Sequence, residues 1–476
     1  MRSIILHDTR TGELLPLRAP DRARPVGIYA CGPTVYSRVH IGNARPFVVF
    51  SLLKRFLEHE GYPVTLVVNV TDVNDKIYDA ARPLGRPSAE LAAEMTAHYR
   101  SDTDALELGR PDHEPLASET IEPIVSHISA LVDSGHAYAS AGDVYFRVRS
   151  DPGYGSLSHR RLESMDQGEG EAADTAESAG LAPAQAPGPD GPERLELPAP
   201  LKEDPLDFAL WKAHKPGEDT VWDSPWGPGR PGWHIECSAM AEQILGVGFD
   251  IHGGGSDLVF PHHENEAAQT RAARGRELAL LWMHNGMIQF TGEKMAKSVG
   301  NIALLHEVLE RYGRDAVVMY LLSGHYRQPL AFSEAALEQA QANVSRIREA
   351  GRRLAVGDSP PALQPLRERY FDALARDFGT PEALAVLNEW LREASDLAHG
   401  GEVGDSHLRE MLTVLGLEAL LAPDAEAPVG VRELAEDRER ARAERDFDAA
   451  DRLRQEIAEL GWEVRDGANG FELLPL

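Results

Sequence analysis

Cysteine is scarce in this sequence, and long apolar segments are absent. Only Cys31 and Cys237 occur among 476 residues, whereas small secreted folds that depend on disulfides use many more. No apolar run approaches the roughly 20 residues of a membrane-spanning helix, and residues 1–15 lack the apolar core of a signal peptide. We therefore expect a cytoplasmic protein with no membrane contact, whose cysteines are core residues, reactive thiols or metal ligands.

Basic residues are also fewer than acidic ones. The chain has 48 Lys and Arg against 76 Asp and Glu, a formal net charge of −28. Because phosphate binding depends on Lys and Arg, this balance argues against tight nonspecific binding of nucleic acid. It does not exclude one shaped RNA partner, since an acidic protein can carry a local basic face.

The first chemistry-bearing segment lies in a predicted βαβ unit. Val26–Cys31 predicts a buried strand, a helical pattern starts at Ala44 with Pro46 in its first turn, and Val64–Val70 predicts a second strand. Such a unit indicates a parallel sheet, whose ligands bind beyond the carboxyl ends of its strands. His40–Asn43 lies at that end.

The whole chain is predicted to be α/β. A Rossmann-like parallel-sheet domain with a connective insertion is followed by an all-α bundle, for which Ser333 is a suitable N-cap, and by a small mixed α/β C-terminal domain. The expected limits are 1–111 and 232–332 for the two halves of the Rossmann-like domain, 112–231 for the insertion, 333–421 for the bundle, 422–430 for a linker and 431–476 for the last domain.

Three groups of polar residues could carry chemistry. At a helix N-terminus, free N–H groups attract anions; there Gly42 allows close approach of a ligand, and His40 and Asn43 can donate to phosphate oxygens. Lys294–Ser298 is flanked by glycines, and its two lysines could fold over a polyphosphate. Each segment taken alone could equally be an ordinary loop, although lysine is rare in this chain.

The third group contains both cysteines. His262 and Glu266 lie four residues apart, hence on one face if the segment is helical, and thiolate, imidazole and carboxylate are all zinc ligands. With Cys31 and Cys237 they would form a set of four. The alternative is that Cys237 is a small core residue and the His/Glu pair a surface contact.

These motifs together resemble a known family. Cys31–Tyr36 leading into His40–Asn43, with Lys294–Ser298 downstream, is similar to the paired signatures of class I aminoacyl-tRNA synthetases. Further segments resemble the cysteinyl-tRNA synthetase family more narrowly; they are Asn69–Lys76, Gly232–Met240, Asp250–Asp257, Phe260–Glu266, Asp372–Leu374 and Asp377–Pro381.

The resemblance implies an ATP-dependent ligase. It would activate L-cysteine as cysteinyl-adenylate, with Mg²⁺ and ATP, and transfer it to the 3′-terminal ribose of tRNA(Cys). One Zn²⁺ per chain would select the substrate thiolate, held by Cys31, Cys237, His262 and Glu266. The C-terminal domain 431–476 would recognise the anticodon, and a monomer is expected.

The resemblance also implies the remaining site residues. The cysteine and adenylate pocket would be lined by Thr71, Trp233, His252 and Asp257. ATP would be bound by Gly32, His40, Gly42, Asn43 and Lys297. The catalytic residues would be His40, Asn43, Lys294 and Lys297. Two positions depart from the commonest signatures, with Asn43 where many members have His and Ala296 where Ser is usual; neither is expected to abolish activity.

Two other functions stay open on the sequence alone. A cysteine ligase of the mycothiol pathway, which acts on an amino sugar, would share the catalytic half but needs no anticodon-reading tail. A non-catalytic RNA-binding paralogue would not need the lysines or the metal set. The presence of the C-terminal domain 431–476 favours the tRNA-charging function. Its arginines could instead simply pair with interleaved acidic residues along a helix surface; they are Arg438, Arg440, Arg442, Arg445, Arg452 and Arg454.

Residues 167–200 generate the first testable prediction. They are mostly Ala, Gly, Pro, Glu and Asp and cannot bury enough apolar surface to offset their ordering entropy, so we expect disorder; a docking tail is the alternative. Deleting 167–200 should therefore leave the melting temperature and the aminoacylation rate nearly unchanged. A large fall in either, measured beside the full-length chain, would show that the segment is ordered or functional.

Overall fold

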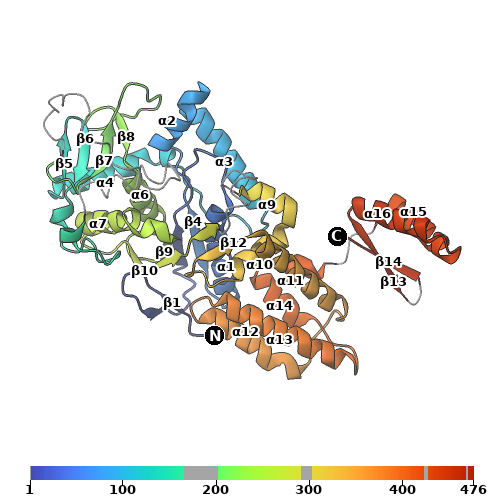
Figure 1. The fold of residues 1–476 in the computed structure, drawn as a ribbon. Helices are drawn as coiled ribbons and strands as arrows, with labels where there is room; N and C mark the ends of the chain where they lie inside the picture. The colour runs from blue at the N-terminus through green and yellow to red at the C-terminus, as the bar shows by residue number, and fades with distance from the viewer. Residues whose placement is uncertain (1, 166–201, 291–302, 423–426, 468–469, 476) are drawn as a thin grey trace. The chain divides into compact units, whose positions relative to one another are not determined.

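The computed structural model describes residues 2–165, 202–290, 303–422, 427–467 and 470–475 (Figure 1). These residues form two compact units, Met1–Leu420 and Leu421–Leu476. No helix in the described part of the chain is long and apolar enough to cross a membrane. Residues 167–200 and Lys294–Ser298 lie outside the described residues, so the predictions made for them stay predictions, as do the domain limits within the larger unit.

The centre of the larger unit is a parallel sheet of four strands, in the order β10–β9–β3–β4 (Figure 1). They are β3 (Val26–Ala30), β4 (Val64–Val68), β9 (Phe249–Gly255) and β10 (Ala279–Asn285). β3 lies between β4 and β9 and is buried along its whole length, which explains its continuous apolar run. The predicted α/β class and the first βαβ unit are confirmed.

Helix α1 (Ile41–His59) begins earlier than the sequence pattern suggested. His40 is its N-cap: the Gly42 N–H donates to His40 Nδ1 at 3.0 Å, and the His40 N–H donates to Asn43 Oδ1 at 3.1 Å. This reciprocal cap satisfies two orphan donors and starts the helix three residues before Ala44. Pro46 therefore lies inside α1, and the prediction that it belongs to the first turn was wrong.

Between β4 and β9 the chain first forms two helices, α2 (Asp75–Ala81) and α3 (Ser88–Asp104). The insertion follows, with helix α4 (Ile121–Asp133) and the antiparallel strands β5 (Ala137–Ser140), β6 (Asp143–Phe146), β7 (Phe208–Ala213) and β8 (Gly229–Pro231). β8 leads directly into α6 (Trp233–Leu245), and Ile235 of α6 belongs to the same core as Phe146 and Phe208. The insertion and α6 therefore pack as one body.

The remaining elements of the larger unit complete the sheet edge and the bundle. They are β1 (Ile5–His7), β2 (Leu14–Pro16), α7 (His262–Arg274), β11 (Ile288–Phe290), α9 (Leu305–Tyr312), α10 (Arg314–Leu322), β12 (Leu330–Phe332), α11 (Glu334–Arg352), α12 (Gln364–Ala375), α13 (Thr380–Ala398) and α14 (Ser406–Val414). Ser333 caps α11 as predicted, accepting the Ala336 N–H at 3.2 Å. α7 connects β9 to β10, so these strands form a second parallel unit.

The smaller unit contains two helices and a hairpin. They are α15 (Val429–Ala443), α16 (Phe447–Glu459), β13 (Trp462–Gly467) and β14 (Gly470–Pro475). Its core includes Ala435, Ile457 and Trp462. The unit is therefore mixed α/β, as the sequence predicted.

One buried carboxylate holds the turn between α12 and α13. Asp377 is 4% exposed, and its oxygens accept from the His7 N–H at 2.9 Å and the Tyr326 hydroxyl at 2.6 Å. The Arg327 guanidinium donates to it at 2.7 Å. Its φ of 58° is left-handed, a conformation that aspartate adopts more readily than most residues. Asp377 thus connects β1, the loop after α10 and the bundle.

Asp377→Ala should lower the free energy of unfolding of the larger unit by about 3 kcal/mol, because buried donors and a cation lose their acceptor. Asp377→Asn preserves the shape and should cost less. The control is Asp372→Ala, whose half-exposed carboxylate pairs with Arg2 at 2.9 Å and should contribute no more than about 1 kcal/mol. Urea unfolding followed by circular dichroism measures all three. Equal effects of the two alanine variants would contradict the role given to Asp377.

Candidate functional site

A cavity of about 310 Å³ opens at the carboxyl ends of β3 and β9, the position at which parallel sheets bind ligands. The predicted site residues that line it are Cys31, Gly32, His40, Gly42, Asn43, Trp233 and Asp257. Thr71 and His252 are buried, at 1% and 0% exposure, and do not line it. Lys294 and Lys297 lie outside the described residues. The structure thus brings residues 31–43, Trp233 and Asp257, which are three separate segments of the chain, to one cavity.

The loop that follows β3 is packed tightly against the end of β4. The Gly32 N–H donates to Asn69 Oδ1 at 2.9 Å, and the Asn69 amide donates to the Thr71 hydroxyl at 3.3 Å. A Cβ at position 32 would lie 1.8 Å from the Asn69 carbonyl oxygen, so only glycine fits there. Thr71 therefore supports the loop of the cavity through Asn69 rather than facing the cavity.

The reciprocal cap of α1 determines which atoms of His40 and Asn43 remain available to bind a ligand. His40 Nδ1 accepts the Gly42 N–H, so the ring proton of the neutral imidazole resides on Nε2; burial lowers the pKa of His40, which favours this neutral form. Asn43 Oδ1 accepts the His40 N–H, which leaves the amide hydrogens of Asn43 free to donate. Both residues can therefore cap α1 and still donate to a ligand in the cavity, and this accounts for an Asn at position 43.

The four predicted metal ligands come together beside this cavity. Cys31 follows β3, Cys237 lies on α6, and His262 and Glu266 lie on α7, whose helical form confirms the predicted i, i+4 pairing. All four are buried, and their donor atoms all lie within 4.8 Å of one another. The described residues thus contain a Cys/His/Glu cluster that could hold a metal ion.

The donor separations suit a small tetrahedral ion. Zinc lies about 2.3 Å from sulfur and about 2.0–2.2 Å from nitrogen or oxygen, which places neighbouring donors about 3.3–3.8 Å apart. Cys31 Sγ is 3.7 Å from His262 Nε2 and 3.6 Å from Glu266 Oε1. His262 Nε2 and Glu266 Oε1 are closer, at 2.8 Å, as a hydrogen-bonded pair, and would separate slightly around an ion.

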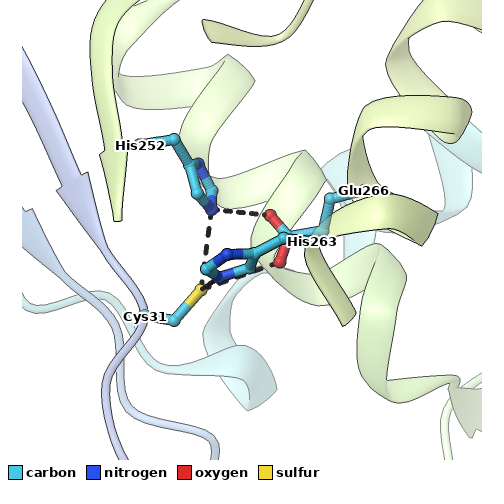
Figure 2. Close-up of side chains that lie close together, drawn as sticks. All are labelled: Cys31, His252, His263 and Glu266. Atoms are coloured by element: carbon cyan, nitrogen blue, oxygen red, sulfur yellow. Dashed lines mark hydrogen bonds and ion pairs between the residues drawn. The ribbon is translucent and has the colours of Figure 1, made fainter. Parts of the chain in front are cut away.

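Two further histidines approach the same atoms (Figure 2). His263 Nε2 lies 3.3 Å from Cys31 Sγ, and His252 Nε2 lies 3.1 Å from Glu266 Oε2. Together with Cys31 and Glu266 they form a second possible ligand set. His263 was not among the predicted ligands; it reaches the cluster although consecutive helix residues point about 100° apart.

Protons and charges are shared across the cluster. A hydrogen bond from Cys31 lowers the pKa of Cys237 to about 6, while burial raises the pKa of Cys31. Burial alone would raise the pKa of Glu266, but His252 and His262 outweigh it and hold that pKa well below its usual range. The pKa of His262 is raised despite burial, by Glu266 and Cys237. A bound cation would replace the shared protons, as in metal sites generally.

The arrangement of the chain is that of the class I aminoacyl-tRNA synthetases. Methionyl-tRNA synthetase of Mycobacterium tuberculosis, in complex with methionyl-adenylate, superposes with a TM-score of 0.57 at 16% identity, over 84% of this chain and 89% of that one. The LeuRS of Agrobacterium radiobacter K84 superposes with a TM-score of 0.58 at 12% identity, over 86% and 85%. At these identities the likeness concerns the fold alone.

Sequence comparison identifies one family within this class. Residues 18–342 match the family described as tRNA synthetases class I (C) catalytic domain. The cysteine--tRNA ligase of Alkalilimnicola ehrlichii is 45% identical over 94% of both chains, and that of Halorhodospira halophila is 42% identical over 98% of both. The chain belongs to the cysteine--tRNA ligase family and is an enzyme with that activity. The family predicted from the motifs is confirmed, and the amino-sugar ligase and the non-catalytic paralogue are set aside.

Proposed function

We propose that this enzyme activates L-cysteine with ATP and transfers it to tRNA(Cys), and that one zinc ion bound by Cys31, Cys237, His262 and Glu266 selects the amino acid. The observation that supports the metal most directly is the buried cluster of four donors, whose atoms all lie within 4.8 Å of one another. Cys31 also lines the cavity, so a substrate there would lie next to the ligand set. When bound, zinc would hold the substrate sulfur as a thiolate and leave a serine hydroxyl poorly satisfied.

This ligand set is preferred to the one that contains His252 and His263. It includes both thiols, and zinc binds thiolates strongly. The second set would leave Cys237 unused in the core. We therefore propose that His252, with its ring beside Glu266, supports the ligands and the cysteine pocket instead.

The cavity suggests a role for each remaining residue. Trp233 lines the cavity and stacks on His262 at 4.1 Å between ring centroids, so it forms a wall of the cavity beside the metal ligands. Asp257 lies on the same cavity. Thr71 holds the loop through Asn69. We propose that Trp233 and Asp257 line the cysteine and adenylate pocket and that Thr71 and His252 support it from behind.

The chemistry requires positioning and charge compensation rather than a covalent enzyme intermediate. The cysteine carboxylate attacks the α-phosphate of Mg²⁺-bound ATP, and pyrophosphate leaves; a terminal ribose hydroxyl of tRNA then takes the acyl group and AMP leaves. His40 and Asn43 would donate to phosphate oxygens from the N-terminus of α1, beside Gly32 and Gly42. Lys294 and Lys297 would neutralise the departing pyrophosphate.

The smaller unit would contact the distant end of the tRNA. Four of its arginines make ion pairs within the unit: Arg438 and Arg442 with Asp466, Arg440 with Asp437, and Arg465 with Glu463. Three others are exposed and make no ion pair with any described residue, namely Arg445, Arg452 and Arg454. We propose that this unit recognises the anticodon, and that the enzyme acts as a monomer in the cytoplasm, where tRNA is charged.

Zinc should be present at one ion per chain in freshly purified, unchelated protein. Cys237→Ser should weaken zinc retention by more than the roughly 10–100-fold that loss of an outer-sphere partner causes, and discrimination against serine should fall with it. Ser238→Ala is the matched control, because Ser238 bonds to Gln269 and not to the donor set. Elemental analysis and cysteine- or serine-dependent pyrophosphate exchange measure both quantities. Absence of zinc, or lost activity with unchanged selectivity, would contradict the assignment.

Removing residues 432–476 tests the two halves of the reaction separately. Cysteine-dependent ATP–pyrophosphate exchange should persist, because every proposed adenylate-site residue lies before Asn301 and the smaller unit is compact by itself. Charging of tRNA should fall sharply, with weaker tRNA affinity and a shallower dependence on salt, since phosphate contacts are lost. The full-length chain, which should perform both reactions, is the reference. Normal charging by the truncated chain would show that the unit serves stability alone.

A further inference from the structure

The metal ligand His262 is hydrogen-bonded on both sides of its ring. Its Nε2 faces the donor cluster, 2.8 Å from Glu266 Oε1. Its Nδ1 faces away and lies 2.9 Å from Nδ1 of His234, on the first turn of α6. One nitrogen is therefore directed to the metal position, while the other has a histidine as its partner.

This contact determines where the ring protons lie. A metal bound through Nε2 needs the lone pair of that atom, so the proton of neutral His262 must be on Nδ1. Nδ1–H can then donate only if His234 Nδ1 accepts. The proton of His234 must consequently be on its Nε2, and the two tautomers follow from one distance.

The His234 ring forms no hydrogen bond with the described residues other than the one to His262. It is 2% exposed, and its Nε2 has no hydrogen-bond partner among the described residues. Its ring meets Phe208 edge-on, with centroids 5.5 Å apart. In the tautomer assigned above, the Nε2–H of His234 has no acceptor among the described residues, a cost that an apolar side chain would avoid. The bond to His262 is the compensating interaction.

We propose that His234 is a positioning residue for the zinc site. It accepts the Nδ1–H of His262 and thereby orients the Nε2 lone pair of that ring toward the cluster, while Trp233 stacks on the ring face at 4.1 Å. Such an outer partner also makes the ligand nitrogen more basic. Consecutive residues of α6 thus hold one ligand in two different ways. The inference rests on the metal assignment proposed above.

His284 provides the matched comparison. It is also buried, and its Nε2 lies 2.7 Å from Nδ1 of His263, so it stands behind His263 as His234 stands behind His262. If the ion were bound by the set that includes His263, His284 would be the outer partner. The two positions therefore discriminate between the two ligand sets.

The experiment compares three variants of the full chain, His234→Phe, His234→Asn and His284→Phe. Zinc affinity is measured by competition with a chromophoric chelator, and the absorption bands of the Co²⁺-substituted proteins report the ligand field. We expect His234→Phe to lose about 10–100-fold in zinc affinity with altered cobalt bands. His234→Asn, whose Oδ1 can replace Nδ1 as acceptor, should remain within about threefold of the wild type, as should His284→Phe.

Other results would overturn the inference. Unchanged affinity in His234→Phe, or equal losses in the Phe and Asn variants, would make His234 a packing residue. A greater loss in His284→Phe than in His234→Phe would assign the ion to the other ligand set. If His234→Phe does not fold, the Asn variant still decides, because it must keep wild-type affinity and cobalt bands. A wild-type chain that binds no zinc would instead refute the metal assignment itself.

Discussion

Burying several ionisable groups in one place is the constraint on which the rest of this structure depends. Thiols, imidazoles and a carboxylate lie together beyond the end of β3, with almost no exposure to water. Each buried charge costs several kcal/mol unless it is paired or coordinated. The opposite shifts of the Cys31 and Cys237 pKa values show how the groups share protons in compensation. The elements around the cluster therefore have to place their donor atoms accurately.

The fold meets this requirement with strand β3, which Cys31 follows, and with helices α6 and α7. α6 and α7 each start close to the cluster, where the first turns of a helix place side chains with little positional freedom. Ile235, on the opposite side of α6 from the cluster, anchors that helix in the core of the insertion. The insertion therefore does more than interrupt the sheet, because its packing sets the position of Cys237 and His234.

Local sequence rules anticipated the elements and several contacts. The i, i+4 relation of His262 and Glu266 follows from helical geometry alone, and the apolar run of β3 indicated a buried parallel strand. The start of α1 was misplaced because a cap formed by His40 and Asn43 is uncommon, and hydrophobic periodicity begins only at the first apolar turn. Thr71 was assigned to the pocket from the family resemblance, which does not distinguish a residue that supports the cavity from one that lines it.

By itself, the sequence determined the α/β class, the family and the identity of the four candidate ligands, because these depend on residue type, short spacings and motifs. The tertiary structure decided what depends on distance between segments far apart in the chain. His263 and His252 approach Cys31 only because β9 lies beside β3 and α7 follows it. In the same way His234 meets His262 only because α6 packs on α7, and no spacing within a single helix could specify which ring nitrogen would face the metal.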